Sequence, residues 1–137
     1  MRRRQFLGRL AVGLAAGALP GCASVAAYRG ELAGGRVQVR IPESEEAAGN
    51  QGAILVRVPE IPDGLLLVNM GDGRMHALSA HCTHLGCQVR PGRNFLTCPC
   101  HGSTFDLEGA VVRGPAPKSL PRFEARRSGD LVEIFLS

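Results

Sequence analysis

The sequence predicts an all-β fold, a sandwich of short antiparallel strands with loops rich in cysteine and histidine at one end. Glycine (18 residues) and proline (9 residues) are frequent, which favours many turns between short elements. Short apolar runs with period-two alternation recur, whereas no long amphipathic helix pattern occurs. The chain is 45% hydrophobic but only 4% aromatic, so Val, Leu and Ile must build most of the core.

Residues 1–21 have the composition of an export signal. They carry four arginines and no acid, and a run of Ala, Gly and Leu extends to Leu19. Arg3-Arg4-Gln5-Phe6-Leu7 resembles the twin-arginine pattern of a pathway that exports folded proteins. Leu19-Pro20-Gly21-Cys22 is similar to a bacterial lipobox, which predicts that Cys22 is lipidated and becomes the first mature residue.

Two alternatives to lipidation stay open for this segment. Leu10–Tyr28 is an uncharged run of 19 residues, close to the ~20 that a membrane-spanning helix needs, so an uncleaved anchor is one of them. A simple cleaved signal is the other. All three predict a bacterial domain that is exported, in the periplasm or at the outer face of the cytoplasmic membrane.

The net charge of +4 does not indicate nucleic-acid binding. The four arginines of residues 1–21 account for the whole excess, because the rest of the chain has 12 basic and 12 acidic residues. The basic character therefore belongs to the signal and not to a binding face.

The first half of the predicted domain consists of strands separated by turns. Residues 22–35 are small, polar and rich in glycine, and are predicted to be a flexible tether to a domain of residues 36–137. Arg36–Ile41 alternates with period two. After a loop over 42–52, the next strands are expected at Ala53–Val58, Leu65–Asn69 and Met75–Ala80, with turns at Pro62–Gly64 and Gly71–Gly73.

A stretch rich in cysteine and histidine interrupts this pattern from His81 to Phe105. A short strand is expected afterwards at Ala110–Val112. Gly114-Pro115-Ala116-Pro117 is predicted to be a stiff loop, because proline fixes φ and removes a donor. The chain is expected to close with a hairpin of Arg122–Arg127 and Leu131–Leu136 around residues 128–130.

Two boxes in the interrupting stretch carry the chemistry. They are Cys82-Thr-His84-Leu-Gly-Cys87 and Cys98-Pro-Cys100-His101-Gly-Ser103, with ten residues between them. Together they resemble the signature of the Rieske iron–sulfur family, Cys-x-His-x-Gly-Cys followed by Cys-x-Cys-His-x-Ser, across 22 positions. The strands of residues 36–137 resemble the family more loosely.

The resemblance implies one [2Fe–2S] cluster per chain. Cys82 and Cys98 would bind one iron as thiolates, and His84 and His101 would bind the other through imidazole nitrogens. Cys87 and Cys100 correspond to the disulfide of the exported branch of the family. The five cysteines then divide into two ligands, one disulfide pair and one lipid attachment site.

Mixed ligation has an electrostatic consequence. Two thiolates and two neutral imidazoles leave an oxidised centre neutral, whereas four thiolates leave it dianionic, so an electron enters the mixed centre more readily. Rieske centres span roughly −150 to +300 mV, against about −400 mV for all-cysteine plant-type clusters. The second nitrogen of His84 and of His101 is expected to gain a proton as the electron arrives.

The resemblance also assigns residues around the ligands. Ser103 occupies the position whose hydroxyl hydrogen-bonds a bridging sulfide, and Phe105 stands where many members carry a tyrosine that hydrogen-bonds a cysteine ligand. Because phenylalanine has no such donor, we predict a midpoint in the middle of the family range. Gly114, Pro115 and Pro117 belong to a segment similar to the proline loop that covers the cluster in quinol-oxidising relatives.

A structural zinc site is the main alternative for the four ligands. Zinc sites usually separate paired ligands by about two to five residues, and Cys-x-His is tighter than that. Zinc also leaves Cys87 and Cys100 unexplained. His76 and His81 are interpreted as structural and surface residues, and the arginines at 90, 93 and 113 as solvated charge or a docking rim for an acidic partner.

The function that the resemblance implies is one-electron transfer. The leading hypothesis is the iron–sulfur subunit of a quinol-oxidising cytochrome bc-type complex, with a cytochrome as partner and quinol bound through a partner. The alternatives are the small subunit of a periplasmic oxidase similar to arsenite oxidase, a stand-alone lipoprotein carrier and, last, a non-redox metal-binding module. The signal and the Cys87/Cys100 pair disfavour a cytoplasmic ferredoxin or oxygenase. No substrate pocket is predicted, so catalysis by this chain alone is not expected.

Overall fold

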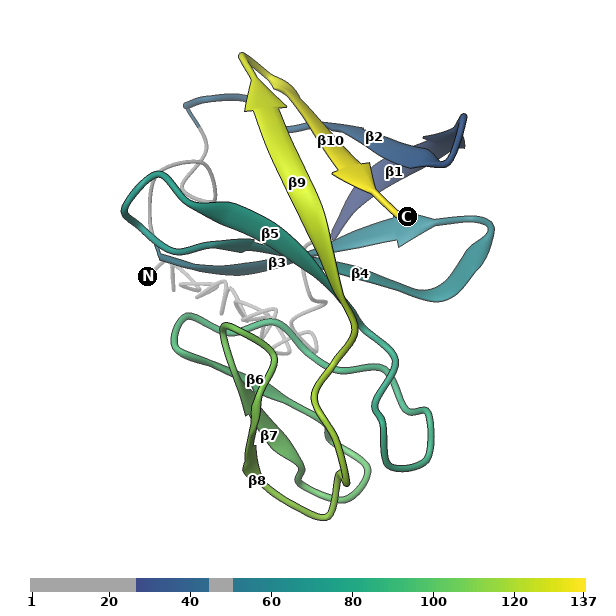
Figure 1. Cartoon of the computed structure of the whole chain (residues 1–137), viewed down its shortest axis with the longest axis vertical. Coiled ribbons are helices and arrows are strands. Elements are labelled where there is room, and N and C mark those ends of the chain that lie inside the picture. The colour runs from purple at the N-terminus through teal and green to yellow at the C-terminus, as the bar shows by residue number, and fades with distance from the viewer. Residues whose placement is uncertain (1–26, 45–50) are drawn as a thin grey trace, which may run out of the picture.

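The computed structural model describes residues 27–44 and 51–137, which form ten strands and no helix (Figure 1). The predicted signal, Cys22 and residues 22–26 of the predicted tether lie outside this part of the chain. Within it, no helix has the length and apolar character needed to span a bilayer. The strands are β1 (Ala27–Ala33), β2 (Arg36–Arg40), β3 (Gly52–Val58), β4 (Ile61–Asn69), β5 (Met75–Ser79), β6 (Phe95–Thr97), β7 (Thr104–Asp106), β8 (Val111–Arg113), β9 (Arg122–Ser128) and β10 (Leu131–Phe135).

Seven of the described strands close into a barrel, in the order β1-β2-β10-β9-β5-β4-β3. The all-β class is therefore confirmed. The main sheet closes on itself where the sequence predicts a sandwich, because β1 pairs with β2 on one side and with β3 on the other. The β1–β3 pair is parallel, and the other neighbouring pairs of the barrel are antiparallel.

Strand β1 occupies residues that the sequence predicts to be a tether. That prediction is wrong from Ala27 onward, and the folded domain begins before residue 36. The small residues that indicated flexibility instead permit close packing. A Cβ atom on Gly30 would lie 2.7 Å from Val37 Cγ1, so only glycine lets β1 lie this close to its neighbours.

The connection between β3 and β4 also differs from the prediction. The tight turn lies at Pro59 and Glu60, and the residues predicted to turn, Pro62–Gly64, belong to the start of β4. The register of the β3–β4 pair shifts between Val56 and Val58. This irregularity lets residues 62–64 continue in the strand where the sequence predicts a turn. The other predicted strands are present within one or two residues of their expected ends.

Two apolar cores lie on opposite faces of the same strands. Leu65 and Leu67 of β4 belong to one core, which β2, β3, β5 and β10 complete inside the barrel. Leu66 and Val68 point the other way and belong to a second core on the outside of the barrel. This explains why β4 is a continuous apolar run, since both of its faces are buried.

Residues 81–121, which we call the loop subdomain, cover this outer core. They connect β5 to β9 and contain the small sheet β6-β7-β8, which lies below the barrel in Figure 1. Leu96 of β6 and Phe105 of β7 are fully buried in the shared core, next to Leu66 and Leu78 of the barrel. The barrel thus supports both boxes from one side.

Candidate metal centre

The two boxes fold into loops with the same pattern of hydrogen bonds. In the first, Gly86 N donates to Cys82 O (3.0 Å) and Cys82 N donates to Cys87 O (3.0 Å). In the second, Gly102 N donates to Cys98 O (3.0 Å) and Cys98 N donates to Ser103 O (2.8 Å). Each loop therefore presents its first cysteine from an equivalent backbone position.

The glycine of each loop is required by its backbone. Gly86 and Gly102 have φ values of +80° and +78°, a region that side chains strongly disfavour. At Gly86 the space is also occupied, since a Cβ atom would lie 2.7 Å from Cε1 of His81. The local sequence thus determines the turn that brings each box back on itself.

Cys82 and Cys98 are the two free cysteines of the described residues, and each is only 1% exposed. Burial raises the pKa of the Cys82 thiol, and a hydrogen bond with the Cys98 side chain raises this pKa further. The backbone amides of His84 and Leu85 act in the opposite direction and lower it. Without a metal the Cys82 thiol therefore holds its proton; a bound metal would displace the proton, and the amide donors would then stabilise the thiolate.

The imidazole rings of His84 and His101, one from each loop, lie close together. Their ring centroids are 4.7 Å apart, and the ring planes are perpendicular. Nδ1 of His84 is buried and has no hydrogen-bond partner among the described residues. A buried polar nitrogen without a partner is costly, so this atom fits the role of a metal ligand.

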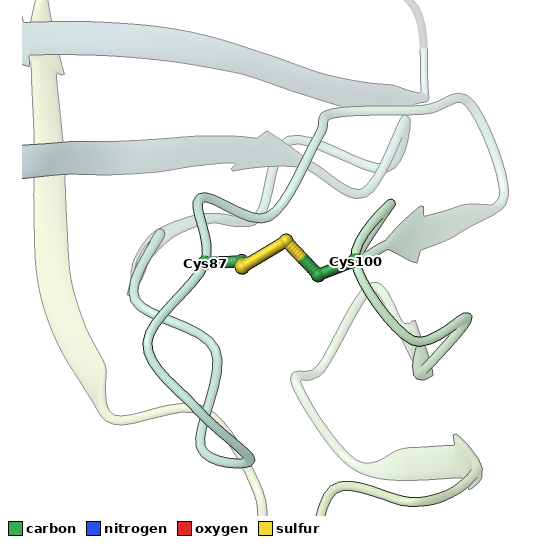
Figure 2. The surroundings of a disulfide bond; sticks show 2 residues. All are labelled: Cys87 and Cys100. Carbon is green, nitrogen blue, oxygen red and sulfur yellow. A yellow bond between two sulfur atoms is a disulfide. The ribbon is translucent and has the colours of Figure 1, made fainter.

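A disulfide joins the two loops. Cys87 and Cys100 are bonded, with a Cα–Cα distance of 6.4 Å (Figure 2). The sulfur atoms of Cys87, Cys98 and Cys100 lie within 4.8 Å of one another. Only Cys98 of these three can bind a metal, because the other two sulfurs are already bonded to each other.

The available donors are therefore two thiols and two imidazoles. This set combines two sulfur and two nitrogen donors, and it fits a [2Fe–2S] centre in which His₂ replaces Cys₂ on one iron.

The predicted proline loop contacts the second box directly. Ala116 N donates a hydrogen bond to Oγ of Ser103 (3.0 Å), and both residues are buried. Gly114, Pro115 and Pro117 are exposed, and the Gly114–Pro115 peptide bond is cis. The hydroxyl of Ser103 retains its own proton as a donor, because its oxygen serves as the acceptor here.

Two contacts of the loops were not predicted from the sequence. Ala116 packs in the same core as Cys82, Cys98 and Phe105. An alanine between two prolines gives no sign in the sequence that it is a core residue. Oγ1 of Thr83 donates to the carbonyl of Lys118 (2.6 Å), which fastens the first box to the segment after the proline loop. Both contacts join segments far apart in sequence, so no local pattern could have revealed them.

The two remaining described histidines have other partners. Nδ1 of the exposed His81 lies 2.5 Å from Oδ2 of Asp63, and Nε2 of the buried His76 lies 2.7 Å from the carbonyl oxygen of Leu107. Burial lowers the pKa of His76. Their interpretation as surface and structural residues agrees with these contacts.

A hollow of about 360 Å³ opens beside the first box, between His84, Leu85 and Lys118. Leu85 is 68% exposed at the tip of this box, although it is apolar. This apolar side chain therefore lies next to a candidate ligand at the rim of the hollow.

Comparison with known proteins gives a consistent result. The sequence model of the Rieske [2Fe-2S] domain family matches residues 31–124. The cytochrome b6-f complex iron-sulfur subunit of Chlorobaculum thiosulfatiphilum is 34% identical over 111 residues, covering 72% of this chain and 61% of that protein. The subunit of the same name from Prochlorococcus marinus (strain MIT 9515) is 38% identical over 136 residues, covering 88% of this chain and 76% of that protein.

A solved structure is also similar. The plasma membrane Rieske protein of Synechocystis PCC 6803 has a TM-score of 0.59 and 31% sequence identity, covering 72% of this chain and 97% of that one. The chain spans 61% or less of the length of the first three curated relatives that it matches.

Proposed function

This chain belongs to the Rieske [2Fe-2S] family, and on that premise we propose that it transfers single electrons through a cluster held by Cys82, His84, Cys98 and His101. The cofactor of the family is a [2Fe–2S] cluster, and this chain carries the domain that binds it. The observation that carries the ligand assignment is that the two loops which bear the buried thiols also bring His84 and His101 within 4.7 Å of each other, measured between ring centroids.

The residues of the centre have distinct roles in this proposal. When bound, the cluster supplies a site that accepts and releases one electron. Cys82 and Cys98 anchor it from the buried side, where the shared core excludes water. His84 binds through Nδ1, the buried nitrogen without a partner, which leaves Nε2 to hold a proton.

The disulfide and the proline loop hold these ligands in position. Cys87 and Cys100 tie the two boxes together, and the hydrogen bond from Ala116 N to Ser103 keeps the proline loop against the second box. Ser103 can then direct its hydroxyl proton at a cluster sulfide, as its family position implies. These contacts limit how far the ligands move when the charge of the centre changes.

The finer proposal is that the chain is the iron–sulfur subunit of a quinol-oxidising complex. Quinol, bound by a partner subunit, is the electron donor, and a cytochrome is the acceptor. The relatives named as cytochrome b6-f iron-sulfur subunits support this role, as does the exposed Leu85 beside His84, which suits contact with an apolar site in a partner.

We further propose that this reaction occurs at the outer face of the cytoplasmic membrane. The predicted export signal, the candidate lipidation site Cys22 and the disulfide support that location. The structure does not describe Cys22, so attachment by lipid or by an anchor stays a prediction from sequence.

Removing candidate ligands tests the proposal. The full-length variants His84→Ala and His101→Ala should lose the visible absorption and the electron paramagnetic resonance signal of the reduced centre. Loss should be complete, because the iron bound by the two histidines would keep only one protein ligand in either variant. His81→Ala and His76→Gln are matched controls that remove a neighbouring histidine and should keep both signals.

The proposal fails if His84→Ala and His101→Ala retain the spectrum of the unmodified protein. Far-ultraviolet circular dichroism should show that the barrel remains folded in each variant, which separates loss of ligands from loss of the fold. Iron and zinc content, measured on the same samples, distinguishes a cluster from the zinc alternative.

A further inference from the structure

The charges of the described residues are divided unevenly between the two regions. The loop subdomain has four basic residues (Arg90, Arg93, Arg113 and Lys118) and only two acids, Asp106 and Glu108. The described part of the barrel, in contrast, has eight of each sign. The excess positive charge of the described residues therefore lies in the region that holds the candidate ligands.

Both acids of the loop subdomain already have partners. Oδ1 of Asp106 accepts hydrogen bonds from the backbone nitrogens of Glu108 and Ala110, at 3.0 and 2.9 Å. The carboxylate of Glu108 pairs with Arg122 of the barrel. Arg90 and Arg113 are exposed and make no ion pair within the described part of the chain.

These two arginines share one face of the small sheet. Arg90 extends the sheet beyond β6, since it exchanges backbone hydrogen bonds with Thr97 at 2.8 and 3.1 Å. Thr97 lies opposite Thr104, and Thr104 lies opposite Arg113. Residues directly opposite one another in a sheet project from the same face, so these four side chains form one row.

This row faces solvent. Leu96 and Phe105, which neighbour the two threonines along the strands, are fully buried on the other face. Phe95 is two residues before Thr97 in the same strand, so its side chain projects from the same face as the row. It is 53% exposed. Val112, at the irregular position of β8 beside Arg113, is 56% exposed. We call these residues the outer face: Phe95, Val112, Arg90, Thr97, Thr104 and Arg113.

We propose that the outer face is a docking surface for an acidic electron-transfer protein. This inference rests on the proposed function, because it names the kind of partner that exchanges electrons with the centre. Thr97 directly precedes Cys98 and Thr104 directly follows Ser103, so a protein on this face sits beside the second box. The exposed His101 of that box would be next to its edge.

The chemistry of the outer face selects a protein as its occupant. An exposed aromatic ring and arginines are the residue types enriched at protein interfaces, and neutral threonines separate the two charges. A polyanion such as nucleic acid, or an anionic membrane, gains affinity from a run of cations, which this face lacks. The matching partner has an apolar patch with carboxylates around it.

Charge reversal on the full-length holoprotein tests this proposal. The variant Arg90→Glu/Arg113→Glu is compared with Arg40→Glu/Arg57→Glu, which makes the same change in net charge at exposed arginines of the barrel. The probes are cytochrome c with succinylated lysines, which is acidic, and unmodified cytochrome c, which is basic. The reduced Rieske protein is mixed with each oxidised cytochrome in a stopped-flow instrument, over a range of ionic strength.

With the acidic probe at low salt, the rate constant of electron transfer should be at least about tenfold lower for the outer-face variant than for the unmodified protein. The barrel variant should change the rate less than about twofold, and the difference should vanish at high salt. With the basic probe the outer-face variant should react faster. Equal effects of the two variants would overturn the proposal, because only the net charge would then matter.

A second measurement separates docking from electron transfer. In nuclear magnetic resonance titrations with succinylated cytochrome c, the amide signals of β6 and β8 should shift, and those of β2 and β10 should not. These shifts report binding whether or not an electron is transferred. Shifts of β6 and β8 without electron transfer would contradict the proposed function but support the docking surface. Shifts on the barrel instead, or equally strong sedimentation with phosphatidylglycerol vesicles that the outer-face variant abolishes, would refute a protein docking surface.

Discussion

The barrel has a core of its own, whereas the loop subdomain relies on the core that it shares with the barrel. Inside the barrel, the apolar residues of five strands pack only against other barrel residues. The loop subdomain contributes strands of three residues each and places Leu96 and Phe105 on the outside of β3, β4 and β5. Strands this short bury too little surface to be stable alone.

The difference shows how the molecule separates stability from chemistry. The barrel is closed by backbone hydrogen bonds along its strands, and it holds no candidate ligand. The loop subdomain holds all four candidate ligands and is fastened by a disulfide, the Thr83–Lys118 contact and the Ser103–Ala116 contact. The centre is therefore expected to respond to local changes that leave the barrel folded.

Removing the disulfide should have the largest effect on the loop subdomain and should leave the barrel folded. The variant Cys87→Ser/Cys100→Ser releases a cross-link between residues 13 apart, and loops of about this length contribute about 3 kcal/mol. We expect the loss to be local, because the disulfide joins only the two boxes. In hydrogen exchange, amides of β6 and β7 should lose protection while those of β2 and β10 keep it, and the cluster should be lost faster.

Val132→Ala is the matched control for the disulfide variant. Val132 is fully buried inside the barrel, so the truncation should lower the free energy of unfolding of both regions together. If the disulfide variant also lowers protection equally in barrel and loop subdomain, the two regions unfold as one unit and the comparison does not hold.

The sequence predicts most strands because their patterns are local. Arg36–Ile41 shows its buried face through alternation, and the final hairpin is flanked by a clear turn. The closure of the barrel could not be predicted, since it depends on β1, whose small residues look like a linker when their partners are unknown. The turn at Pro62–Gly64 was misplaced for a similar reason, because an irregular strand contains the same residue types as a turn.

The candidate ligands could be predicted from the sequence, whereas the contacts that support them could not. Spacing within each box groups a cysteine and a histidine on one turn, so the chemistry is local. Thr83, Ala116 and Asp63 support the loops through partners far along the chain, and their residue types are ordinary. The outer face is another nonlocal feature, because its row of side chains depends on the register of four segments.

Phe105→Tyr should change the reduction potential of the centre and leave the fold of the loop subdomain intact. Phe105 is fully buried in the core that contains Cys82 and Cys98, and a tyrosine hydroxyl there would donate a hydrogen bond to a cysteine ligand. Such a bond stabilises the more negative reduced form by about 1 kcal/mol, or about 40 mV for a one-electron couple. A redox titration followed by circular dichroism measures the upward shift.

Phe123→Tyr is the control, because Phe123 packs against the core inside the barrel. It should leave the midpoint unchanged. An unchanged midpoint in Phe105→Tyr as well would contradict the explanation that the missing hydroxyl sets a mid-range potential.

The smallest expected effect concerns His76, which connects the two regions. It lies on β5, and its Nε2–H donates to the carbonyl of Leu107 in the loop subdomain. Burial lowers its pKa in the folded protein, so the unfolded chain binds a proton more readily. The stability that neutral His76 contributes is therefore complete above the ordinary histidine pKa of about 6.5, and it is lost as the pH falls below that value.

His76→Gln should remove this part of the pH dependence, because glutamine keeps an N–H donor for Leu107 and does not titrate. Between pH 7.5 and 5.5, the midpoint of chemical denaturation should fall less in the variant than in the unmodified protein. His81→Gln is the comparison, since the exposed His81 does not experience the same burial. Parallel pH curves for the His76 variant and the unmodified protein would mean that the contact between barrel and loop subdomain does not depend on the charge of His76.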